Sequence, residues 1–100
     1  MARVILEICV DSPEGLAAAI EGGADRIEVC AALNLGGLTP SPGMIEKARK
    51  ARIPVVAMVR PRAGDFVYGP DDLEVMEADI GAIRAAGLSG VVFGASRPDG

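Results

Sequence analysis

The chain has 100 residues, of which half are hydrophobic but only 3% aromatic, and its formal net charge is −4. This length allows one domain at most, with an aliphatic core of the kind found in parallel sheets that helices cover. The negative charge and the lack of a long basic cluster argue against binding to nucleic acid. No apolar run approaches the ~18 residues of a membrane span, so we expect neither nucleic acid nor a membrane as a partner.

Histidine is absent from the chain, and there are two cysteines, Cys9 and Cys30. The commonest general base and the commonest metal ligand are therefore missing. Two cysteines do not make a disulfide framework, and the first residues run straight into a predicted strand without the features of a signal peptide. We therefore expect a cytoplasmic protein with reduced thiols.

Strands and helices are predicted to alternate along the chain. Four short apolar segments are typical of strands: residues 4–10, 25–30, 54–59 and 90–94. Three segments between them have helical spacing and capping signals: residues 12–22, 41–51 and 71–86. Serine followed by proline opens the first two helices, and Asp71 with Glu74 predicts a capping box for the third. The loops 31–40 and 60–70 are long for such connections and are candidates for functional segments.

This order of elements predicts an α/β fold with a parallel sheet and right-handed crossovers. An open doubly wound sheet and a (β/α) barrel both have this order. The charged side chains within the strands favour the barrel, because its interior accepts them in layers, whereas helices cover both faces of an open sheet. A barrel needs eight strands and ~250 residues. We therefore interpret residues 1–100 as the N-terminal half of a TIM barrel, with four parallel strands and three helices.

The first two strands share a pattern of one carboxylate and one thiol. Leu6-Glu7-Ile8-Cys9 is repeated as Ile27-Glu28-Val29-Cys30. Because side chains alternate between the faces of a strand, Glu7 shares a face with Cys9, and Glu28 shares a face with Cys30. The opposite faces are aliphatic and are expected to pack against helices.

Together with motifs further along the chain, this repeat resembles the CutC family, which is named for copper homeostasis. The residues that carry the resemblance are Leu6–Cys9, Gly23–Cys30, Gly36–Ser41, Arg60-Pro61-Arg62, Gly64-Asp65-Phe66, Tyr68 and Glu77–Ile80. The resemblance implies a TIM-barrel fold and a cytoplasmic protein that is tied to copper, with residues 1–100 as a partial domain of this kind. Ala63 and Val67 depart from the family pattern, which more often has glycine and cysteine at these positions.

Cys9 and Cys30 are the candidate metal ligands. Both are predicted to lie at the carboxyl ends of neighbouring strands, where barrel sites are built, and soft thiolates select Cu(I) over hard cations. A free cysteine is also a small buried hydrophobic residue, and the residues alone favour that interpretation. The family resemblance raises the metal hypothesis, so our leading prediction is a cytoplasmic protein that binds copper as Cu(I) through these two thiolates.

Glu7 and Glu28 support a different prediction, a barrel enzyme that acts on a small anionic metabolite. Two carboxylates act as general acid and base when their surroundings separate their pKa values. Alternatively, the two carboxylates form internal ion pairs, for which Arg26 and Arg60 are the nearest partners in the sequence.

In the enzyme hypothesis, Arg60 and Arg62 bind the anion, because guanidinium groups match phosphate or carboxylate bidentately. Asp65 belongs to the same segment and is equally suited to pair with either arginine. Gly36-Gly37, which precedes a helix, is a weak signal for a backbone anion cradle.

Met58 has the same strand parity as Arg60 and is predicted to face the barrel interior, where a thioether is a possible copper ligand. Met44 and Met76 lie on apolar helical stripes and are predicted to be core residues. We also expect a homo-oligomer, because the first and last strands of this polypeptide are sheet edges that recruit other chains.

Overall fold

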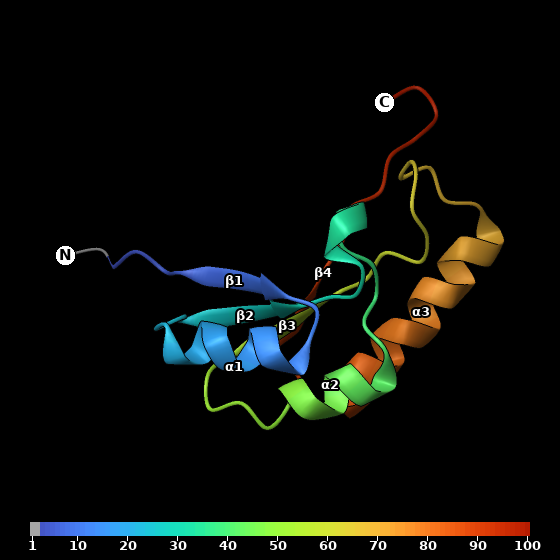
Figure 1. Ribbon diagram of the computed structural model, residues 1–100. Helices are drawn as coiled ribbons and strands as arrows, with labels where there is room; N and C mark the ends of the chain where they lie inside the picture. The colour runs from blue at the N-terminus through green and yellow to red at the C-terminus, as the bar shows by residue number, and fades with distance from the viewer. Residues whose placement is uncertain (1–2) are drawn as a thin grey trace.

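The computed structural model describes residues 3–100, and within them four strands and three α-helices alternate along the chain (Figure 1). The strands are β1 (Glu7–Val10), β2 (Arg26–Val29), β3 (Val55–Met58) and β4 (Gly90–Val92). The helices are α1 (Pro13–Glu21), α2 (Pro42–Ala48) and α3 (Pro70–Ala85). A short 3-10 helix, η1 (Leu33–Leu35), lies in the long loop after β2 and was not predicted from the sequence.

The strands form one parallel sheet in the order β1-β2-β3-β4. Each strand therefore lies beside its neighbour in the sequence. A doubly wound sheet would instead reverse its strand order at a switch point, so this order agrees with the barrel interpretation. The predicted α/β fold with four parallel strands and three helices is confirmed.

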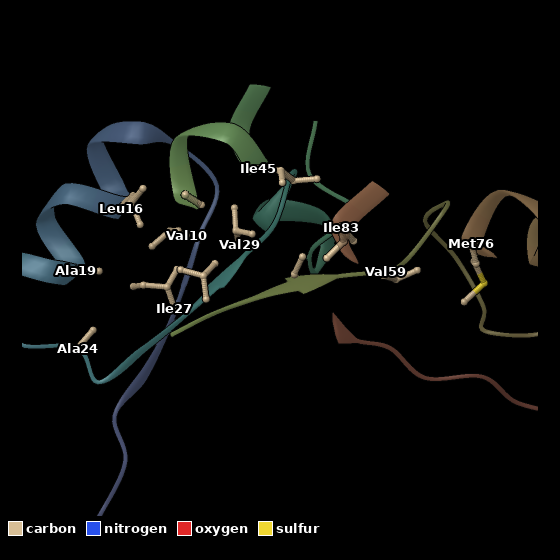
Figure 2. Close-up of a cluster of buried hydrophobic side chains, with 13 residues drawn as sticks. Val10, Leu16, Ala19, Ala24, Ile27, Val29, Ile45, Val59, Met76 and Ile83 are labelled. Atoms are coloured by element: carbon tan, nitrogen blue, oxygen red, sulfur yellow. The ribbon is translucent and has the colours of Figure 1, made fainter. Parts of the chain in front are cut away.

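One face of the sheet packs against the helices and forms the hydrophobic core. Alternate strand residues, which include Ile27 and Val29 with no exposed surface, point to this side. Figure 2 shows Leu16 and Ala19 of α1 directed toward these strand side chains. Full burial of a branched aliphatic side chain contributes about 1.5–3 kcal/mol, so this face fixes which residues of each strand point the other way.

The element boundaries differ from the prediction in ways that hydrogen bonding explains. β1 begins at Glu7 rather than Val4, because residues 4 and 5 lie beyond the start of β2 and find no strand to pair with; Val4 is 88% exposed. The predicted capping box of Asp71 and Glu74 is wrong. The third helix begins one residue earlier, and the carboxylate of Asp72 accepts the backbone N–H of Gly69 at 3.4 Å.

Across residues 3–100, none of the helices combines the length and the apolar character that a membrane crossing requires.

Candidate metal centre

Two thiols and one carboxylate meet on the sheet face that points away from the helices. Cys9 lies on β1 opposite Glu28 of β2, and Cys30 follows β2 directly. The two sulfur atoms and a carboxylate oxygen of Glu28 all lie within 4.8 Å of one another. The prediction that these side chains share a face is confirmed, because the parallel register places Cys9 beside Glu28 and Ile8 beside Ile27.

The carboxylate of Glu28 holds both thiols. The Cys9 thiol donates to Glu28 Oε2 at 3.5 Å, and the Cys30 thiol donates to the same oxygen at 3.3 Å. Glu28 is 7% exposed and Cys30 is 1% exposed, whereas Cys9 is exposed. Water or an ion therefore reaches the cluster from the side of Cys9.

Burial and the carboxylate of Glu28 favour the protonated form of both thiols. Burial, followed by the hydrogen bond to Glu28 and the negative charge of that carboxylate, raises the pKa of the Cys30 thiol strongly. Burial and the charge of Glu28 also raise the pKa of the Cys9 thiol. The negative charge of Glu28 opposes the loss of these protons. A bound metal ion would reverse that effect, because its positive charge is the largest in the site and deprotonates a coordinating thiol outright.

The donor set fits a soft metal ion. Metal–thiolate bonds are about 2.3 Å long for zinc, so two thiolates on one ion are about 4.6 Å apart or closer. The two sulfur atoms lie within 4.8 Å of each other, which is close to this limit. Thiolates select Cu(I), Zn(II) and iron–sulfur clusters over hard cations such as Mg²⁺. The residues present therefore suit Cu(I), with Glu28 as a neighbouring negative charge.

Glu28 does not form the ion pair that the sequence suggested. Arg26 pairs with Glu7 instead, because these two residues lie opposite each other in the register of β1 and β2. No guanidinium or ammonium group lies within salt-bridge distance of Glu28 in the part of the chain that the structure describes. The alternative in which Glu28 pairs with Arg26 or Arg60 is therefore wrong, and its carboxylate accepts hydrogen bonds from the two thiols instead.

Arg60 binds backbone carbonyl groups of two loops. Its Nη1 donates to the carbonyl oxygens of Leu35 at 2.7 Å and Gly37 at 3.2 Å, and its Nη2 donates to that of Gly64 at 3.1 Å. The guanidinium also stacks over the ring of Phe66 at 5.0 Å. The side chain thus ties the loop after β2 to the loop after β3.

Arg62 is also bound by groups of the chain itself, mainly by carboxylates. Its guanidinium pairs with Asp65 and with Asp72, each at 3.2 Å, and lies over the ring of Tyr68. The expected pairing of Asp65 with one of the two arginines is confirmed for Arg62. Both proposed anion-binding arginines thus bind acceptors of the chain itself, and their role toward a substrate stays a prediction.

Gly37 belongs to this site and was not recognised as part of it. Its φ is +95°, a region that favours glycine, and its backbone passes directly beside Cys30. The signal for it in the sequence is the pair Gly36-Gly37, which only weakly indicates a backbone anion cradle. In the structure the carbonyl oxygen of Gly37 instead accepts a hydrogen bond from Arg60.

The model of the CutC family matches residues 4–100. The chain belongs to the CutC family. A CutC family protein of Sinorhizobium medicae is 65% identical over 100 residues, which are all of this chain and 41% of that relative. A CutC family protein of Agrobacterium fabrum is 63% identical over 97% of this chain and 39% of its own length. The chain therefore spans about two fifths of these curated relatives.

A crystal structure of a CutC protein from Streptococcus agalactiae, whose name refers to copper homeostasis, has the same fold over almost the whole chain. The TM-score is 0.90 and the sequence identity is 32%, and the match covers 97% of this chain and 48% of that one. The four parallel strands and three helices are thus a fragment of the TIM-barrel-like CutC fold, and the predicted family is confirmed.

Proposed function

We propose that this CutC family protein binds copper as Cu(I) in the cytoplasm, with the thiolates of Cys9 and Cys30 as the ligands. The observation that supports this most is the meeting of two thiols and one carboxylate within 4.8 Å at the carboxyl ends of β1 and β2. These ends are where a TIM barrel builds its functional sites. The family, and the copper homeostasis in the name of the Streptococcus agalactiae structure, support the same metal.

In this proposal, Cu(I) is the cargo and the chain supplies soft ligands in a guarded position. Cys30 is buried and Cys9 is exposed, so the ion enters at Cys9 and is then held between the two sulfurs. Each thiol releases its proton when it binds the metal. The carboxylate of Glu28, which accepts both thiol hydrogen bonds, then offsets the positive charge of the ion.

The test is an anaerobic titration of the natural full-length protein with Cu(I) in the presence of a competing chelator. We expect one Cu(I) per chain and a loss of affinity of about 100-fold or more in the Cys9→Ser, Cys30→Ser double variant, since even outer partners of a metal typically cost 10–100-fold.

Ser89→Ala, a change at the opposite, amino-terminal end of the sheet, is the matched control and should leave the affinity unchanged. Equal affinity of the double variant and the parent would refute the thiolate site.

A further inference from the structure

We propose that the thioether of Met58 is a third sulfur ligand for the same ion and that it makes the site selective for Cu(I) over Zn(II). This inference rests on the proposed copper site and extends it to a residue on β3.

The register of the sheet brings Met58 beside Cys30. Glu28 is the partner of Val56, and Val29 is the partner of Ala57. The next step along the two strands places Cys30 beside Met58, on the same face as Glu28 because side chains alternate. Neighbouring strands are about 4.8 Å apart, so the two sulfur-bearing side chains start from adjacent backbone positions.

Packing at Gly37 places the ends of both side chains beside the same loop residue. A Cβ atom at Gly37 would lie 3.4 Å from Met58 Cε and 3.7 Å from Cys30 Sγ. The methyl end of Met58 and the thiol of Cys30 thus both lie within 4 Å of one point. The loop that carries Gly37 is fixed there by Arg60, which donates to its carbonyl oxygen at 3.2 Å. The loop therefore covers Cys30 and Met58 on the same side.

Thioether chemistry explains what Met58 would add. Thioethers are soft ligands that select Cu(I). A thioether also carries no charge, so it adds a donor to a cluster that already contains the carboxylate of Glu28 without adding to the repulsion there. Zn(II) binds carboxylate oxygen readily. In this proposal Glu28 is therefore the additional ligand for Zn(II), and Met58 is the additional ligand for Cu(I). Removal of the thioether should therefore weaken Cu(I) binding and spare Zn(II) binding.

The test compares Met58→Leu with Met76→Leu in the natural full-length protein. Leucine keeps the apolar character and approximate volume of methionine, and Met76 is a buried core residue of α3 that serves as the control (Figure 2). We expect Met58→Leu to weaken Cu(I) binding by about tenfold or more, the scale of effects around metal sites, and to leave Zn(II) binding unchanged. Met76→Leu should change neither affinity.

X-ray absorption of the unmodified protein loaded with Cu(I) gives an independent count of the sulfur ligands, which should be three. Two sulfurs, or an unchanged Cu(I) affinity in Met58→Leu, would overturn the role of Met58 while the cysteine site stands. Failure of the parent to bind Cu(I), or insensitivity to loss of both cysteines, would instead overturn the copper proposal itself.

Discussion

The same residue pattern, a glutamate and a cysteine separated by one residue, has different surroundings in β1 and in β2. In β1, Glu7 pairs with Arg26 at the partly exposed edge of the sheet, and Cys9 is exposed. β2 lies between two other strands, and there Glu28 and the residue that follows the strand, Cys30, are buried and contact each other. The register and the position of a strand in the sheet, rather than the shared pattern, therefore decide whether its carboxylate pairs with an arginine or accepts hydrogen bonds from two thiols.

The largest expected effect concerns the edge position itself. In the polypeptide of residues 1–100, β1 and β4 are the outer strands, and apolar side chains beside them are exposed, with Leu6 at 48% and Phe93 at 58%. Exposed edges of this kind pair with other chains. We predict that this polypeptide self-associates at micromolar concentration and that Leu6→Lys with Phe93→Lys reduces the association, as measured by sedimentation.

The matched control for that prediction places the same two charges on helices. Ile20 of α1 and Val75 of α3 have similar exposed fractions of 40% and 49%. Lysine at both positions should leave the association unchanged. A parent polypeptide that sediments as a monomer and melts cooperatively would contradict the prediction.

A second expected effect concerns the influence of Glu28 on the pKa values of the two thiols. Replacement of Glu28 by glutamine removes the negative charge and weakens the thiol hydrogen bonds that raise the pKa of both cysteines, so we predict that both pKa values fall. The pKa of Cys30 should stay above its ordinary value, because burial is the largest cause of its shift. Thiolate absorbance followed against pH in metal-free protein measures this, with the exposed Glu46→Gln as the control.

The same shifts predict how stability depends on pH. A thiol whose pKa is raised in the folded state binds its proton more tightly there than in the unfolded state. The resulting stabilisation is complete below the unfolded pKa of about 8.5 and is lost as the pH rises toward the folded value. The metal-free protein should therefore lose stability above that pH, and Cys9→Ser with Cys30→Ser should reduce the loss. A decline of the same steepness in that variant would contradict the linkage.

The smallest expected effect is that of the ion pair in β1. Glu7 and Arg26 are partly exposed, with 29% and 43% of their side-chain surface accessible. Pairs of this kind contribute about 0–1 kcal/mol. A double-mutant cycle with Glu7→Gln and Arg26→Gln, measured by urea denaturation of the full-length protein, should give a coupling energy in that range. A coupling well above it would mean that the edge pair is as protected as the cluster in β2.

The fold and the shared faces of the site followed from local patterns. The period of two along the strands places Cys9 and Glu28 on the interior face, and the alternation of strands and helices predicts a parallel sheet. Both predictions needed no knowledge of distant contacts. The same alternation along the strand predicts that Met58 faces the barrel interior, unlike the methionines of the helices.

The partners of the charged groups could not be predicted in this way. Arg26 lies two residues from Glu28 and on its face, yet the register of the two strands places it beside Glu7. Register depends on the turns and the packing of the whole sheet, which a short motif does not contain. The carbonyl partners of Arg60 depend on the path of two loops, and backbone acceptors carry no signal in the sequence at all.

The offset between Cys9 and Cys30 has a consequence for oxidation. Cys9 lies opposite Glu28, so Cys30 is two residues further along the neighbouring strand. Strand spacing and rise put their Cα atoms about 8 Å apart, whereas disulfides need about 4.4–6.8 Å. The sheet thus allows the two sulfurs to share an ion but resists a covalent bond between them. β1 would have to shift against β2 before oxidation could join the two sulfurs in a disulfide and block the site.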